Sequence, residues 1–361
     1  VQGACCVYSS RDAFACIGKE SRMKKGTDRK KLVRVIMTFA VTFIMTSVFL
    51  LDIFTYIMCN KYEKEYTFTD EDFSLTDGDD RIHFLNTANS DCILLESNGH
   101  FALVDSGEGN HNPRKKTEYH GFSEDVINYL KKVALKYDGR VYLDFILGTH
   151  CHYDHYGSFE DIINDTDIII EKAYFKVYDP SVGTEIESKS WGNSDTYNRI
   201  MTALNKRGIP VISNLPDGEF AFGDFKVKFF NTVTPEELKG RGENSASVGV
   251  KLTKGERTAF LAADFTAGSG LEEYYGDSIG QVDLLKVGHH GYFGSSSPSF
   301  LKKLKPKIAI VTNYLGKIYP NVKWNLTVVA KVPIFSCVNK DGIVATFTDG
   351  NEIKLSENAM K

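Results

Sequence analysis

One long apolar stretch precedes a series of short apolar segments separated by polar turns. The 17 residues from Val35 to Leu51 carry no charge, and a second apolar stretch, 53–59, follows Asp52. At about 1.5 Å per residue, a helix through both stretches is long enough to cross the hydrocarbon core of a bilayer. Residues 61–80 are polar and acidic without apolar periodicity, which is typical of a linker.

From residue 81 onward, alternating or continuous apolar runs predict strands, and stretches with helical periodicity predict helices. Asn98-Gly99 predicts a hairpin turn, Ser123 and Ser297 fit helix N-caps, and Gly208 fits a helix end. The predicted strands lie at 81–86, 91–97, 100–106, 141–147, 167–175, 281–288, 307–313 and 342–355, the predicted hairpins at 219–231 and 247–265, and the helices at 123–137, 158–165, 194–208 and 296–305. This alternation indicates a layered α/β architecture with mixed sheets.

The charge pattern gives the predicted span a direction. Lysines and arginines cluster before it, so the positive-inside rule places the N-terminus in the cytoplasm and the body outside. We favour an uncleaved signal anchor over a cleaved signal peptide, because the run is long and no small-residue cleavage site follows. Residues 1–22, which precede Met23, fit an upstream extension. The predicted parts are a basic cytoplasmic tail (1–31), a transmembrane signal anchor (32–59), a linker (60–79) and a folded domain (80–357).

Composition and charge limit the partners of the body. The chain has 361 residues, 42% hydrophobic and 25% charged, which is enough for a sizeable core. Residues 1–60 hold nine Lys/Arg and four Asp/Glu, so the remaining 34 basic and 43 acidic residues give the body a net charge of −9. A strongly basic nucleic-acid surface is therefore not expected there. The seven cysteines predict no disulfide framework.

The candidate chemistry is concentrated in the sequence THCHYDHYG. His150, His152, Asp154 and His155 follow a predicted strand, where loops can direct side chains into a shared cleft. Imidazole and carboxylate groups together suit a divalent metal such as zinc or manganese. Cys151 lies between two of these histidines, and we expect its side chain to point away from the metal.

Four further residues follow apolar runs and could join this motif. Asp264 ends the run LAADF, and a buried carboxylate there needs a compensating cation. His289 and His290 follow the run LLKVG. Asp105, in VDSG, fits a group that accepts a hydrogen bond from a ligand imidazole. Taken singly, each could instead be an ordinary turn or loop residue.

The order of these motifs resembles the metallo-β-lactamase superfamily: VDSG, H-x-H-x-D-H, a strand-end aspartate and a late histidine. LKVGHHGYFGSSSP is similar to the ComEC-like branch of that superfamily. FLNTANSDCILLESNGHFALVDSGEG and ENSASVGVKLTKGERTAFLAADF most resemble the catalytic domains of bacterial cell-wall phosphorylcholine esterases. The resemblance covers about residues 80–315. It implies an αβ/βα sandwich, here preceded by one N-terminal transmembrane helix, with the metal site at the sheet edges.

The resemblance also implies two divalent metal ions, with zinc favoured and manganese as the alternative. The implied ligands are His150, His152, Asp154, His155, Asp264 and His290. The first two would hold one ion, the next two and one histidine of the 289–290 pair the other, and Asp264 would bridge both. We favour His290 as the ligand and His289 as a contact to phosphate. Asp154 is the candidate base if it is not a ligand.

The sequence departs from the family pattern at one ligand. Many members have a further histidine between the first motif and the bridging aspartate, but none occurs here between His155 and His289. GENSASVG lies in that stretch, with Asn244 and Ser245 as weak substitutes. The ComEC-like branch also tends to lack this ligand, so an active site is still expected. The ion at the first two histidines should be the looser one.

Three functions fit these features. We favour a single-pass, membrane-anchored, extracytoplasmic phosphodiesterase or phosphoesterase, in which a hydroxide shared by the two ions attacks a small or envelope-linked phosphodiester, including phosphorylcholine-type substrates. A ComEC-like nuclease for single-stranded DNA is the alternative, although the charge of the body disfavours nucleic acid. A non-catalytic metal-binding interaction domain is the third. The sequence does not define an oligomeric state.

Overall fold

The computed structural model describes residues 10–63, 79–113, 121–357 and 359–360. The chain divides into two compact units, with the boundary between Phe54 and Thr55. Helix α1 (Ser10–Glu63) contains the stretch Arg29–Lys61, which is long and apolar enough to cross a membrane. The helix extends beyond the predicted span on both sides because no proline interrupts it. Most of the predicted linker (64–78) and residues 1–9 of the predicted tail lie outside the described residues.

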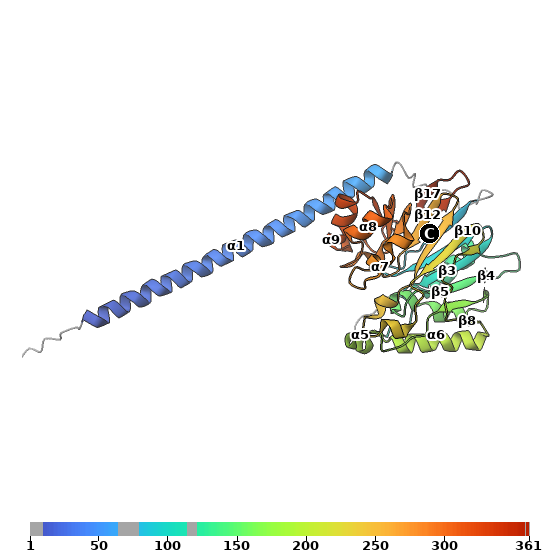
Figure 1. Cartoon of the computed structure of the whole chain (residues 1–361), viewed down its shortest axis with the longest axis horizontal. Helices are drawn as coiled ribbons and strands as arrows, with labels where there is room; N and C mark the ends of the chain where they lie inside the picture. Colours follow the sequence, from blue (N-terminus) through green and yellow to red (C-terminus); the bar gives the residue numbers. More distant parts are fainter. Residues whose placement is uncertain (1–9, 64–78, 114–120, 358, 361) are drawn as a thin grey trace, which may run out of the picture. The chain divides into compact units, whose positions relative to one another are not determined.

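The second unit is built on two large sheets (Figure 1). The first has the strand order β17 (Ile353–Glu357), β16 (Ile343–Phe347), β1 (Asp80–Phe84), β2 (Cys92–Ser97), β3 (His100–Ser106), β5 (Phe145–Gly148), β7 (Ala173–Phe175), β8 (Val211–Ile212). The second has the order β15 (Ile334–Ser336), β14 (Ile308–Val311), β13 (Leu284–Lys286), β12 (Arg257–Leu261), β11 (Gly249–Lys254), β10 (Phe225–Phe230), β9 (Phe220–Phe222). A small sheet pairs β4 (Val141–Leu143) with β6 (Ile168–Ile170).

Helices cover the outer face of each sheet, and Figure 1 shows α6 on one side and α7 and α8 on the other. The helices are α2 (Ser123–Val133), α3 (Tyr153–Tyr156), α4 (Phe159–Asn164), α5 (Glu185–Ser190), α6 (Asn193–Arg207), α7 (Leu271–Ile279), α8 (Pro298–Leu304) and α9 (Pro320–Lys323). Short helical turns lie at η1 (Pro235–Leu238), η2 (Glu243–Ala246), η3 (Gly288–Gly291), η4 (Leu315–Lys317) and η5 (Trp324–Val329).

Three large apolar cores and one small cluster follow from this layering. The central core lies between the sheets and includes Phe84, Leu147 and Leu261. A second core packs α2, α4 and α6 on the first sheet, and a third packs α7, α8 and α9 on the second. Successive side chains along a strand point to opposite faces of its sheet, so each sheet contributes to the central core and to one outer core. The arrangement is the mixed αβ/βα sandwich predicted from the sequence.

Several local predictions differ from the structure. The run 167–175 forms two strands, β6 and β7, in different sheets, because Glu171 and Lys172 interrupt its apolar pattern. Helix α2 ends at Val133 rather than at residue 137. Ser123 is not the N-cap, since its hydroxyl donates to Ser158 Oγ instead. Ser297 does cap α8, accepting a hydrogen bond from the Phe300 amide.

Candidate metal centre

The candidate site lies where strands of both sheets end. β3 and β5 are parallel neighbours, so Asp105 at the end of β3 lies beside the H-x-H-x-D-H motif that follows β5. β12 and β13 are parallel neighbours in the other sheet, and Asp264 and His290 follow them. Carboxyl ends of parallel strands meet at one edge of a sheet, which is where α/β folds place their ligands. The two sheet edges therefore bring the predicted residues together.

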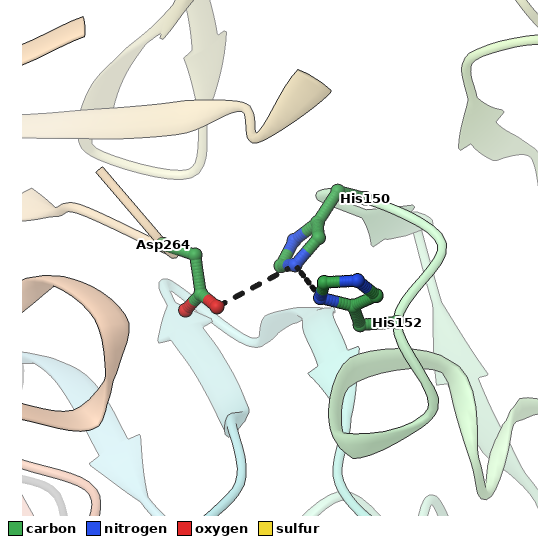
Figure 2. Close-up of side chains that lie close together, drawn as sticks. All are labelled: His150, His152 and Asp264. Carbon is green, nitrogen blue, oxygen red and sulfur yellow. Dashed lines mark hydrogen bonds and ion pairs between the residues drawn. The ribbon is translucent and has the colours of Figure 1, made fainter. Parts of the chain in front are cut away.

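The first cluster consists of His150, His152 and Asp264, all buried (Figure 2). His150 Nε2 lies 3.2 Å from His152 Nδ1 and 3.6 Å from Asp264 Oδ2. Figure 2 shows His150 between the other two side chains, with Asp264 approaching from the opposite ribbon. One imidazole nitrogen from each histidine and one carboxylate oxygen thus face a common point.

The second cluster consists of Asp154, His155 and His290, and Asp264 of the first cluster also lies beside it. The Nε2 atoms of His155 and His290 lie 3.2 Å apart, and His290 Nε2 is 3.5 Å from Asp154 Oδ2. Asp264 Oδ1 lies 3.3 Å from His155 Nε2 and 3.4 Å from His290 Nε2. The two oxygens of Asp264 therefore face different clusters, as a bridging carboxylate requires.

The donor atoms fit divalent ions on geometric grounds. Two ligands at about 2.0–2.1 Å from a tetrahedral metal lie about 3.3 Å apart, and the His–His nitrogen pair in each cluster is separated by 3.2 Å. Asp154 Oδ1 and Asp264 Oδ1 are buried and accept no hydrogen bond among the described residues. A buried carboxylate oxygen without a donor is costly unless a cation compensates it. The residues present therefore fit two ions.

Asp105 orients His155 rather than joining the ligands. His155 Nδ1 lies 2.7 Å from Asp105 Oδ2, which leaves Nε2 to face the cluster. The amide and hydroxyl of Thr149 both donate to Asp105, each at 2.8 Å. Both carboxylate oxygens of Asp105 are thereby occupied. This is the arrangement by which a carboxylate fixes the tautomer of a ligand histidine.

The remaining candidates occupy the edge of the site. His289 Nε2 lies 3.8 Å from Asp264 Oδ2 and 3.2 Å from the Asn244 side-chain nitrogen. Its side chain is 28% exposed, whereas that of His290 is fully buried. Ser245 is directed away, because its hydroxyl donates to the Gly242 carbonyl. Asn244, but not Ser245, therefore lies where it could substitute for the missing histidine.

Cys151 points out of the cluster, as predicted. Its thiol donates to the Asn193 carbonyl at 3.3 Å and is buried at the start of α6. Burial raises the pKa of this thiol well above its usual value, with the charge of Glu243 acting in the same direction. A neutral, buried thiol is a poor nucleophile.

The surroundings of the two clusters have opposite effects on their histidines. In the first cluster they favour a neutral ring at His150, and in the second they favour a protonated ring at His290. Burial lowers the pKa of His150 to about 3, so its ring is neutral at pH 7. Burial also opposes charge on His290, but the carboxylates of Asp91 and Asp264 outweigh it and raise that pKa to about 9. Burial would raise the pKa of Asp264, yet the charge of His155 and the other imidazoles holds it well below its usual range. A cation binding the second cluster therefore displaces protons.

Several residues that contact the ligands are absent from the predicted site, although Trp191 is among the aromatic residues that the sequence places near the candidate loops. Glu187, in α5, has Oε1 3.3 Å from His152 Nε2, and the ring of Trp191 stacks on His152 at 4.5 Å. Asp91 and Lys286 form a buried ion pair behind His290. Only Lys286 carried a visible signal, as a charged residue inside the apolar run LLKVG. Asp91 lies within FLNTANSDCILLESNGHFALVDSGEG, whereas Glu187 and Trp191 lie outside the quoted motifs.

Comparison with known proteins identifies several similar sequences and structures. The profile of the metallo-beta-lactamase superfamily matches residues 85–312. The chain is 24% identical over 173 residues to "ComE operon protein 3" of Bacillus subtilis, covering 47% of this chain and 20% of the relative. It is 30% identical over 84 residues to "Recombination protein 2" of Haemophilus influenzae, covering 23% of this chain and 10% of the relative. The chain thus matches only a minor part of each relative.

Two solved structures show the extent of structural similarity. The metallo-beta-lactamase fold protein YhfI from Bacillus subtilis is 13% identical with a TM-score of 0.44, covering 72% of this chain and 96% of that one. CmlA, a diiron beta-hydroxylase from Streptomyces venezuelae, is 14% identical with a TM-score of 0.38, covering 68% of this chain and 48% of that one.

Proposed function

The chain belongs to the metallo-β-lactamase superfamily, with relatives that support its ComEC-like branch, and from this premise we propose that it is a metal-dependent phosphodiesterase. In this proposal α1 anchors the chain in a cell membrane and the body acts outside the cytoplasm on a small or envelope-linked phosphodiester. The observation that carries the proposal is the pair of buried clusters bridged by Asp264, each with two imidazole nitrogens at ligand spacing.

The ligand set suits hydrolysis of a charged ester. Two bound divalent ions supply the chemistry by lowering the pKa of water and neutralising charge on phosphoryl oxygens. We assign one ion to His150, His152 and Asp264, and the other to Asp154, His155, Asp264 and His290. Zinc is favoured because nitrogen ligands outnumber carboxylates, with manganese as the alternative.

His289 is the histidine placed to meet substrate. Its backbone is left-handed, with φ 49°, and its ring lies beside Asp264 and remains partly exposed. Burial lowers the pKa of His289 below its ordinary value. The ring is therefore neutral at pH 7 and offers one N–H donor. That donor suits a phosphoryl oxygen. Asp154, with one oxygen free of hydrogen bonds, acts as a ligand or accepts a proton.

Aromatic side chains continue from His289 toward solvent. The ring of Tyr292 lies 5.5 Å from that of His289 and 5.9 Å from that of Tyr319, which lies 6.2 Å from Phe293. We call Tyr292, Phe293 and Tyr319 the aromatic rim. Phe293 is 71% exposed, an unusual position for a phenyl ring. Exposed aromatic faces suit a cationic head group such as a quaternary ammonium.

Charge favours a small diester over a long polyanion. DNA binding depends on lysines and arginines that neutralise successive phosphates, and the body after residue 60 carries −9. The basic run LKKLKPK is the best candidate for such a track. Two of its lysines are engaged elsewhere, since Lys303 pairs with Asp277 and Lys307 with Asp283. A DNA nuclease remains the second candidate because both curated relatives belong to the ComEC-like branch.

A substrate comparison on the full chain in detergent tests the proposal. We expect hydrolysis of bis-nitrophenyl phosphate or nitrophenyl phosphorylcholine to exceed cleavage of single-stranded DNA at matched metal concentration and low salt. Asp264→Asn serves as the inactive control, because it keeps the shape of the side chain but removes the bridging charge. Efficient DNA cleavage with no turnover of small diesters would replace the leading proposal by the nuclease. No turnover of any ester by metal-loaded chain would leave only a binding role.

A further inference from the structure

A buried ion pair joins the two sheets directly behind the metal centre. Lys286 ends β13 in one sheet, Asp91 precedes β2 in the other, and the Lys286 ammonium contacts Asp91 Oδ2. Both side chains are at most 1% exposed. Lysine is almost never fully buried without a partner. A buried ion pair also contributes less to stability than its contacts suggest, because both charges lose their hydration. The pair therefore calls for a role other than stabilisation.

Asp91 lies close enough to the ligand residues to bind a metal ion itself. Its carboxylate forms potential metal-binding groups with Asp264 and His290, and with Asp105 and His155. Three contacts occupy its oxygens. Lys286 Nζ takes Oδ2, while the Thr312 hydroxyl donates to Oδ1 at 2.6 Å and His290 Nδ1 lies 3.2 Å from the same oxygen.

The pair contacts two ligand residues and the residue that precedes a third. His290 Nδ1 lies 3.0 Å from the Thr312 hydroxyl and 3.2 Å from Asp91 Oδ1, so His290 Nε2 points at His155. The Asp91 amide donates to the Asp154 carbonyl at 3.1 Å. Lys286 Nζ donates at 3.0 Å to the carbonyl of Ala263, the residue before Asp264.

Lys286 also supports an unfavourable backbone conformation. Ala263 has φ 43°, a left-handed conformation that costs a non-glycine residue roughly 1–2 kcal/mol. Its carbonyl accepts hydrogen bonds from Lys286 Nζ and from the His289 amide. These bonds hold the turn that aims Asp264 between the clusters. Neither Asp91 nor Lys286 has a described contact with His150 or His152.

We propose that Lys286 keeps Asp91 out of the metal shell, and that the pair together positions the ligands of the second cluster, including the shared Asp264, but not His150 and His152 of the first. This inference rests on the proposed metal centre. In it Asp91 and Lys286 are positioning residues. Lys286 decides which buried carboxylates are ligands, because its charge satisfies Asp91 and leaves Asp154 and Asp264 for the ions.

Cadmium NMR on the full chain in detergent tests this inference without relying on activity. The cadmium resonance reports the type of ligand atom, and wild type should give two signals. His152→Ala identifies the first-cluster signal by removing it. We expect Lys286→Met to shift the second-cluster signal toward oxygen coordination, because Asp91 then enters the shell. The first-cluster signal should move much less, since only the shared Asp264 connects it to Lys286. Asp91→Asn leaves an unpaired ammonium behind His290 and should weaken the second site by about 10- to 100-fold, leaving the first unchanged.

Matched variants separate positioning from general damage to the fold. Lys176→Met removes another buried lysine, one that donates to the Ala246 carbonyl, and should leave the second-cluster signal in place. Adding Lys286→Met to Asp91→Asn removes the unpaired charge and should recover part of the affinity. If Lys286→Met fails to fold, Asp91→Asn decides the question.

Two results would overturn the inference while leaving the metal centre intact. One is a second-cluster signal and affinity that do not change in either Asp91→Asn or Lys286→Met. The other is an equal disturbance of both sites in each variant. Absence of bound cadmium in wild type would instead refute the proposed metal centre itself, and the inference with it.

Discussion

The Nε2 atoms of His155 and His290 face each other at 3.2 Å, although 135 positions separate the two residues in the sequence. Both rings are fully buried, and each is oriented from behind by a carboxylate, Asp105 for His155 and Asp91 for His290. Two imidazole nitrogens held in this way form half of a tetrahedral shell. The arrangement makes the second cluster the better defined of the two.

Metal content should reflect this difference. We expect wild type to bind between one and two equivalents of zinc or manganese. Graded chelation should remove the ion of the first cluster first, because that cluster has three protein ligands rather than four. Elemental analysis during dialysis against chelator measures this. Loss of both ions together would contradict it, and a chain that takes up no metal and shows no thermal shift would remove the basis of the proposed function.

Single ligand substitutions should abolish hydrolysis. Asp264→Asn and His155→Ala each remove a ligand of the second cluster, and the first also removes the bridge, so kcat should fall to background. Ser245→Ala is the matched control, because its hydroxyl donates to the Gly242 carbonyl and is directed away from the clusters. Initial rates at saturating metal provide the measurement. Substantial activity in Asp264→Asn would mean that the bridge is not required.

The aromatic rim should affect binding more than turnover. Phe293→Ala removes its exposed ring, and we expect a higher KM for nitrophenyl phosphorylcholine with little change in kcat, since the ring is remote from the ligands. Bis-nitrophenyl phosphate, which has no cationic group, should show a smaller effect. Equal effects on both substrates would indicate that the rim does not recognise a cation.

The stability of the fold should depend on pH through Lys176. Burial lowers the pKa of this ammonium to about 7, against an ordinary value of 10.5. The unfolded chain therefore binds the proton more tightly, so this residue's contribution to stability increases as pH rises from 7 toward 10.5 and is lost as pH falls through 7. The free energy of unfolding of wild type should rise relative to that of Lys176→Met, by at most about 1.4 kcal/mol per pH unit. Parallel unfolding curves would contradict this.

Orientation in the membrane can be tested by proteolysis. Because the basic residues precede the apolar stretch of α1, we expect protease added to intact cells or protoplasts to remove the body and leave the lysine-rich head protected. Antibodies to each end report the fragments. Protection of the body would reverse the orientation, whereas its release into the medium without protease would favour a cleaved signal peptide.

The sequence by itself was sufficient for the family, the layered α/β class and the candidate span. Ligand-type residues directly after apolar runs are a local signal, and six of them, His150 and Asp264 among them, converge in the structure. Their metal binding stays a prediction. Strand boundaries were harder to predict from the sequence. The run 167–175 predicts one strand, but Glu171 and Lys172 divide it between two sheets.

The tertiary structure supplies the physical reason for distinguishing residues that look alike in sequence. His289 and His290 are adjacent and identical, yet backbone geometry buries one against His155 and leaves the other partly exposed. The Asp91–Lys286 pair joins positions 195 residues apart, and no local pattern records which strand ends will meet. Periodicity and residue type are properties of short segments, whereas the orientation of ligands depends on contacts between sheets, which form only when the two layers pack together.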